Sequence, residues 1–156
     1  MSSCAEIFRN LAAHPISVGH SAATPLCDGK PESRRRCADM TLNSHKIRFF
    51  RQRVPSFECI PGCHDCCGPV TTSSEEIARL PVKSVEEHDA ALVNLNCVYL
   101  GENGCEVYSE RPLICRLFGT TPKLPCPRGR RPEFLIDRDI EMKIQQYFSE
   151  TRQVLL

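Results

Sequence analysis

The chain has 156 residues, which suits one ordinary domain and leaves little room for two. Its net charge of +1 gives no argument for a polyanionic partner. The N-terminus lacks the apolar stretch of a secretory signal, and no run approaches the ~20 apolar residues of a membrane-spanning helix. We therefore expect a cytoplasmic protein with no membrane partner.

Residues 1–39 differ from the rest of the sequence. They carry scattered Ser, Pro, Ala and His and show no convincing helical or strand period. Met40 then opens a segment that has the character of folded protein. Two interpretations remain open: residues 1–39 are a disordered tail, or they are translated upstream sequence and Met40 is the true start. In either case residues 40–156 are predicted to form the domain.

Three helices are predicted in the first two thirds of that domain. A short basic helix over residues 44–53 should end before Val54-Pro55. Ser73 with Glu76, and Ser84 with Glu87, both have the spacing of a capping box, in which a hydroxyl and a carboxylate pair with free amides at a helix start. These signatures predict one helix over about 74–80 and another from 84 to about 96.

A β-hairpin is predicted next. Two short apolar runs, 97–100 and 105–108, are separated by the Gly- and Asn-containing segment 101–104. Ser109 is then positioned to cap a short helix that contains Cys115.

The remaining residues complete a predicted α+β fold class. Residues 119–133 are rich in Pro, Gly and basic residues and are expected to be irregular. A last helix over about 134–153 places an apolar stripe against the core. The prediction is a mostly helical small domain with a short β-hairpin and an irregular, cysteine-rich centre that metal stabilises.

The strongest chemical signal is a run of four cysteines within nine residues, Cys59-Ile-Pro-Gly-Cys63-His-Asp-Cys66-Cys67. A loop that contains Pro and Gly lets several thiols converge, as Zn(II) and iron–sulfur clusters both require. In a reducing compartment, eleven cysteines favour metal or redox chemistry over disulfides. Adjacent side chains usually diverge, so Cys66 and Cys67 are expected to serve different irons, different metals, or one metal and one exchangeable function.

Four more cysteines lie downstream of this motif. Isolated cysteines are often small core residues, but together with the motif they provide enough thiols for two four-thiolate sites, or for one site with thiols to spare. The metal, and the cysteines that share a site, are left open. The predicted metal ligands are Cys59, Cys63, Cys66, Cys67, Cys97, Cys105, Cys115 and Cys126.

The segment from Cys59 to Cys126, less than half of the chain, resembles the YkgJ-like cysteine cluster family, a zinc- or iron-chelating domain with a CxxCxxCC motif. The resemblance also rests on Gly104-Cys105-Glu-Val-Tyr108 and on Arg111-Pro112-Leu-Ile-Cys115-Arg116. The sequence departs from the family where three residues, not two, separate Cys59 from Cys63. The resemblance implies binding of zinc or an iron–sulfur cluster. It also extends to relatives labelled iron–sulfur oxidoreductases and to others that methylate flagellin.

Several charged residues are candidates for supporting roles. Arg111 and Arg116 flank Cys115 and could offset the charge near −2 of four thiolates around a metal, so they are predicted cofactor-binding residues; an ordinary exposed helix face is the equal alternative. His64 and Asp65 could ligate or orient ligands, although a solvent-facing histidine and a turn-forming aspartate are favoured. A basic patch without acidic residues comprises Arg111, Arg116, Lys123, Arg128, Arg130 and Arg131.

Two classes of function fit these observations. The first is a metal-binding module with a structural, storage or delivery role. The alternative is an iron–sulfur oxidoreductase or a metal-assisted group-transfer enzyme. No Walker, dinucleotide-binding, Ser–His–Asp or HExxH pattern is present, so no catalytic residue is identified. The basic patch has no interleaved aromatic residues, which makes nucleic acid an unlikely partner; a protein partner is left open.

Overall fold

The computed structural model describes residues 31–156, without the side chains of residues 31–37 and 39. The predicted tail or alternative start therefore lies mostly outside the described residues, and the boundary at Met40 remains a prediction. The α+β class is confirmed. The helices are α2 (Pro31–Arg51), α3 (Ser74–Ile77), α4 (Val85–Val93), the 3₁₀ helix η1 (Tyr108–Glu110), α5 (Leu113–Leu117) and α6 (Arg138–Glu150), and the strands are β1 (Thr71–Ser73), β2 (Leu100–Gly101), β3 (Gly104–Cys105) and β4 (Gln153–Leu155).

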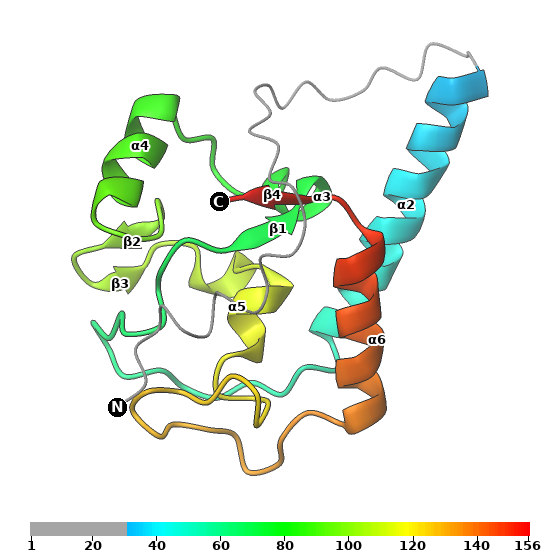
Figure 1. Cartoon of the computed structure of the whole chain (residues 1–156). Helices are drawn as coiled ribbons and strands as arrows, with labels where there is room; N and C mark the ends of the chain where they lie inside the picture. The colour runs from blue at the N-terminus through cyan, green and yellow to red at the C-terminus, as the bar shows by residue number, and fades with distance from the viewer. Residues whose placement is uncertain (1–30) are drawn as a thin grey trace.

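Helix α2 is longer than the sequence predicted. It ends at Arg51, close to the expected end, but it begins at Pro31 instead of near residue 44. Proline suits this first position because its missing N–H would have no partner there. The C-terminal half of α2 stands beside α6 (Figure 1), where Ile47 and Phe50 are buried.

The core lies where α2, α5 and α6 meet. Its largest buried side chain is Tyr147, whose ring centroid lies 5.9 Å from that of Phe50. Within residues 31–156, no helix combines the length and the apolar character needed to cross a membrane. The buried core comprises Ile47, Phe50, Val54, Val70, Leu80, Tyr99, Val107, Leu113, Ile114, Leu117, Phe118, Leu124, Ile136, Ile144, Tyr147 and Leu156.

Strands β1 and β4 form an antiparallel pair that the sequence analysis did not predict. Thr71 lies opposite Leu155, and Ser73 lies opposite Gln153. Ser73 is fully buried, and its hydroxyl accepts a hydrogen bond of 3.1 Å from the Tyr147 hydroxyl. The predicted capping box at Ser73 is therefore wrong: Ser73 makes no side-chain cap to α3, which ends at Ile77.

The second capping box is confirmed. The Ser84 hydroxyl accepts from the Glu87 amide at 3.2 Å, and the Ser84 amide donates to the Glu87 carboxylate at 2.7 Å. Helix α4 ends at Val93, earlier than expected, because Leu95 takes a left-handed φ of 53° that an α-helix cannot continue.

The predicted hairpin is also confirmed, with shorter strands: β2 and β3 pair Leu100 with Cys105 across a tight turn. The prediction that Ser109 caps the following helix is wrong. Ser109 lies in η1, and α5 begins only after Pro112, with no side-chain cap at that position. Instead, the Leu113 amide at the start of α5 donates to the Glu76 carboxylate at 2.7 Å.

The C-terminal part of the domain follows the prediction more closely. Residues 119–133 contain no helix or strand. Helix α6 begins four residues later than predicted because Asp137 caps it, accepting from the amides of Asp139 at 2.9 Å and Ile140 at 3.1 Å. Ile144 and Tyr147 on its inner face are buried, as the predicted stripe required.

Candidate metal centre

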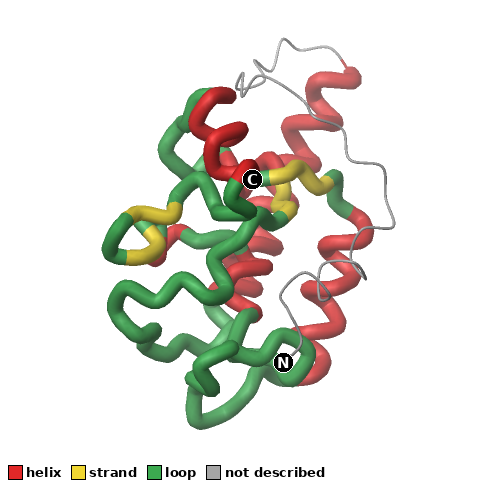
Figure 2. The backbone as a smooth tube through the Cα atoms, turned by 60° about the vertical axis from the view of Figure 1, so that its left-hand side comes forward, coloured by secondary structure: helices red, strands yellow, loops and turns green. Residues whose placement is uncertain are grey.

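The eight predicted ligands lie in the part of the domain with the least regular structure. Figure 2 shows that long loops occupy this side of the molecule, away from α2 and α6. Cys105 is in β3 and Cys115 is in α5, and the other six are in loops. All eight are free thiols and all are half-buried.

Cys67, Cys97, Cys105 and Cys115 form what we call the inner group. The Cys97 amide donates to the Cys67 carbonyl at 3.4 Å, which joins the motif loop to the segment that leads into the hairpin. Burial is the main cause that raises the pKa of the Cys115 thiol, and the nearby charges of Cys97 and Cys105 raise it further. Cys97, Cys105 and Cys115 also pack against the hydrophobic core.

The neighbouring thiols of Cys66 and Cys67 influence each other's ionisation. A hydrogen bond from the Cys67 thiol lowers the pKa of Cys66 to about 7, against the opposing effect of burial. The same hydrogen bond, together with burial, raises the pKa of Cys67. Cys66 therefore ionises nearer neutral pH than Cys67 does, and it lies between the inner group and the remaining cysteines.

Cys59, Cys63 and Cys126 form what we call the outer group. Burial is the largest cause that raises the pKa of Cys59, followed by the charges of Cys63 and Cys66 and then that of Cys126. The extra residue between Cys59 and Cys63 does not remove Cys59 from the neighbourhood of the other thiols. A turn with Gly62 at φ +72° and a 3.0 Å hydrogen bond from the Cys63 amide to the Ile60 carbonyl accommodate it.

The two groups do not form a closed coordination sphere. Among residues 31–156, no set of three or more His, Cys, Asp or Glu side chains already has the arrangement that would hold a metal ion. The donors nevertheless fit one chemically, because thiolates are the ligands that Zn(II) and iron–sulfur clusters take. The fold already brings these thiols near one another, and a bound metal would move them into a coordination geometry.

Arg111 places a positive charge beside these thiols. Its guanidinium lies 3.8 Å from the centroid of the Tyr108 ring and donates to the Tyr108 carbonyl at 2.9 Å. Burial raises the pKa of Cys105 and the pKa of Cys115, and the charge of Arg111 acts in the opposite direction on both thiols. Arg111 therefore favours the thiolate form that a metal requires.

Arg116 makes a different set of contacts. It donates to the Arg111 carbonyl at 3.0 Å and also to the Ser109 carbonyl. Burial, followed by the charges of Arg51 and Arg111, lowers the pKa of Arg116 to about 10. The side chain thus fastens η1 to α5, the helix that carries Cys115.

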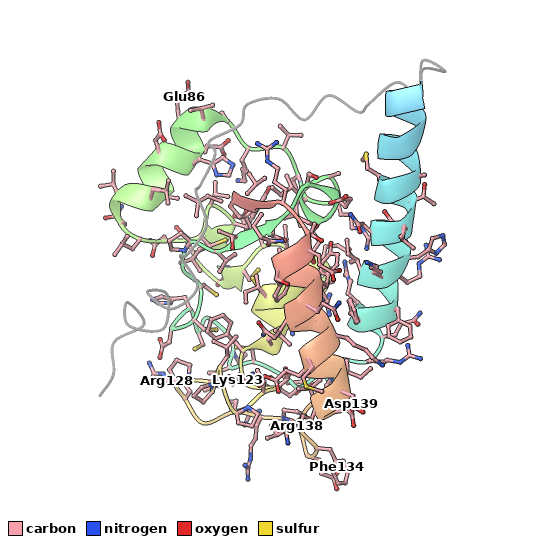
Figure 3. The ribbon with its side chains drawn as sticks, turned by 45° about the vertical axis from the view of Figure 1, so that its right-hand side comes forward. Glu86, Lys123, Arg128, Phe134, Arg138 and Asp139 are labelled. Carbon is pink, nitrogen blue, oxygen red and sulfur yellow. The ribbon has the colours of Figure 1, made fainter. Side chains whose placement is uncertain are left out.

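Two of the six residues of the predicted basic patch, Lys123 and Arg128, have acidic partners, and Arg130 contacts a carbonyl. Lys123 Nζ lies 3.7 Å from the Glu141 carboxylate, Arg128 pairs with Asp65, and Arg130 donates to the Glu58 carbonyl at 3.3 Å. Figure 3 shows Lys123 and Arg128 at the end of the molecule opposite Glu86.

Two acidic residues have roles that local sequence patterns did not reveal. Asp65 pairs with Arg128, 63 positions away, instead of only forming a turn. Glu76 is buried and accepts hydrogen bonds from the Thr72 hydroxyl and the Leu113 amide. His64 is exposed, as favoured from the sequence, and its Nδ1 lies 3.3 Å from the Gly62 carbonyl.

Residues 58–147 match the family model CxxCxxCC, whose description is "Putative zinc- or iron-chelating domain". No curated protein and no solved structure matches the chain. The matched segment spans more than half of the 156 residues and contains all eight cysteines of the inner and outer groups, Cys66 included. The resemblance inferred from the sequence is thereby confirmed, and the chain belongs to the CxxCxxCC family of zinc- or iron-chelating domains.

Proposed function

We propose that the protein binds zinc or an iron–sulfur centre through its eight clustered cysteines. The observation that carries this proposal is the gathering of thiols from four separate segments, 59–67, 97–105, 115 and 126, into two neighbouring groups. Zn(II) would tie these segments together, and an iron–sulfur cluster would in addition accept and donate electrons.

The ligands in this proposal are the inner and outer groups, with Cys66 between them. Arg111 would offset the negative charge of the bound thiolates. Free thiols at all eight positions fit a reducing, cytoplasmic location, which belongs to the same proposal. The four segments bring few buried apolar side chains of their own, so metal binding should contribute to the folding free energy of this half of the domain.

The test is the metal content of protein purified without oxygen. Zinc, iron and acid-labile sulfide per chain are measured together with the visible spectrum. Matched iron and sulfide with a brown charge-transfer band identify a cluster, and zinc in a colourless sample identifies a zinc domain. Protein with neither metal and eight reactive thiols would overturn the proposal.

Cysteine variants identify the ligands. Cys115→Ser and Cys59→Ser should each lower the metal content, one through the inner group and one through the outer group. Cys27→Ser is the matched control, because Cys27 precedes the family domain and is not among the predicted ligands. Equal metal content in all three variants would exclude Cys59 and Cys115 as ligands.

An enzymatic role is the second candidate, and the ionisation of Cys66 favours it. A pKa of about 7 gives this half-buried thiol a larger thiolate fraction at neutral pH than an ordinary cysteine has, and the thiolate is the reactive form. An iron–sulfur oxidoreductase would show a reversible reduction potential that shifts in Cys66→Ser. A metal-assisted group-transfer enzyme would instead show stoichiometric modification of Cys66 or of a substrate, with no redox change.

A further inference from the structure

The loop that carries Cys126 is fastened to the cysteine motif by arginine side chains. Arg128 Nε donates to Asp65 Oδ2 at 2.5 Å, and Asp65, followed by the nearby charge of Cys63, raises the pKa of Arg128. Arg130, two residues further on, donates to the Glu58 carbonyl at 3.3 Å. Both contacts join the Cys126 loop to the two ends of the segment that contains Cys59 and Cys63.

Cys126 depends on these contacts more than any other thiol of the two groups. It is the only member of the outer group outside the motif, and residues 119–133 around it contain no helix or strand. The residues on either side of it, Pro125 and Pro127, are exposed. Burial therefore holds this loop only at its ends, at Leu124 and Pro132, and side-chain contacts hold the exposed residues between them.

We propose that Asp65 and Arg128 form a clasp that brings Cys126 to Cys59 and Cys63 and sets how fast the outer group takes up and releases metal. This proposal rests on the proposed function, since it requires the outer group to bind metal. Asp65 and Arg128 are positioning residues: they hold the loop that carries Cys126, and they are not ligands. The outer group is then an exchangeable site, whereas the inner group retains its metal.

The exposure of the clasp explains why it can open. The side chains of Arg128 and Asp65 are 60% and 30% exposed, so water and salt reach the ion pair and weaken it. The inner group has no comparable opening, because three of its four thiols pack against the hydrophobic core. Salt should therefore accelerate metal release from the outer group and leave the inner group unaffected.

The test measures zinc release from the full chain. Zinc-loaded protein is mixed with an excess of a chromophoric chelator in a stopped-flow instrument, and the wild type should release zinc in a fast outer phase and a slow inner phase. Arg128→Gln should accelerate the fast phase about tenfold, the lower end of the effect of losing a side chain that positions a metal ligand. The slow phase should not change.

Matched variants separate the clasp from net charge. Arg131→Gln removes the same charge from the same exposed loop, and Arg131 makes no ion pair or hydrogen bond within the part of the chain that the structure describes. It should release zinc at the wild-type rate. Asp65→Asn should match Arg128→Gln, and the double variant should match either single variant, because both changes open the same contact.

The outcomes distinguish the two proposals. Equal fast phases in Arg128→Gln and Arg131→Gln would overturn the clasp while leaving metal binding intact. Raising NaCl from about 0.1 M to about 1 M should accelerate the fast phase of the wild type alone, and a wild-type rate that salt does not change would also overturn it without any variant having to fold. A wild type that holds no zinc, iron or cluster would overturn the proposed function and the clasp with it.

Discussion

Replacing Glu76 by alanine should destabilise the domain more than any other single change to a polar side chain described here. Glu76 is 3% exposed, and its carboxylate accepts at 2.7 Å from the Thr72 hydroxyl and at 2.7 Å from the Leu113 amide. Alanine leaves both donors buried without a partner. Each such loss costs about 1–3 kcal/mol, so for the two donors we expect a decrease of about 2–6 kcal/mol in the free energy of unfolding. That is a large part of the stability of an ordinary domain, about 5–15 kcal/mol.

Glu76→Gln is the informative comparison. The glutamine oxygen can accept from the Leu113 amide, and its NH₂ can donate to the Thr72 hydroxyl, because a hydroxyl also accepts. Both hydrogen bonds survive without the charge, so the decrease should be only about 1–2 kcal/mol. Urea unfolding followed by far-UV circular dichroism measures both variants. An alanine variant within about 1 kcal/mol of the wild type, or a glutamine variant as unstable as alanine, would refute this reasoning.

Glu76 should also couple stability to metal binding. Its carboxylate fixes the first turn of α5, and Cys115 is two residues beyond Leu113 in the same helix. Glu76→Ala should therefore weaken metal retention by the inner group. Ser84→Ala provides the control, because it loosens α4 without contacting α5. Equal metal retention in the two variants would show that α5 does not depend on Glu76 for its position.

Four further results are expected. Gly119→Ala should lower the free energy of unfolding by about 1–3 kcal/mol. The φ angle at Gly119 is +78°, and a Cβ there would lie 2.5 Å from the Phe57 ring and 2.9 Å from the Arg130 carbonyl. An unchanged urea midpoint would contradict this prediction. Ser84→Ala should lower the free energy of unfolding by about 1 kcal/mol and should accelerate amide hydrogen exchange in α4 alone. Burial raises the pKa of Tyr147 to about 12, so the unfolded chain releases this proton first and stability should fall between about pH 10 and 12, less so in Tyr147→Phe. Chelation should increase amide exchange across the cysteine segments and leave α6 protected, and a uniform loss of protection would contradict a local role for the metal.

The two capping-box signatures show where sequence reasoning succeeds and where it fails. Ser84 and Glu87 are exposed, no distant group competes for them, and the local pattern decides the structure. Ser73 has the same spacing to Glu76, but it is buried in β1 and meets Tyr147, 74 positions away. Its hydroxyl is paired with the Tyr147 hydroxyl and not with the first turn of α3. A local signature therefore predicts a cap only where the residue stays at the surface.

The sequence also reveals one part of the candidate site and not another. The eight cysteines are found by their identity and spacing, because few other residues suit a soft metal, and their role as ligands remains a prediction. The contacts that position them are not visible locally. From the sequence, Asp65 is predicted to form a turn and Arg128 to belong to a basic loop. In the fold, Arg128 Nε lies 2.5 Å from Asp65 Oδ2. Such pairs depend on loop paths that hydrophobic periodicity does not encode.

The pairing of β1 with β4 determines the order in which the domain can assemble on the ribosome. Thr71 of β1 pairs with Leu155 of β4, which is 84 residues later in the chain. The two strands therefore cannot pair until nearly the whole domain has emerged from the exit tunnel. Every cysteine of the inner and outer groups precedes β4 and emerges earlier. Metal can therefore reach the thiols of the nascent chain before β1 and β4 close the domain, and an early metal would shorten the search for that last long-range contact.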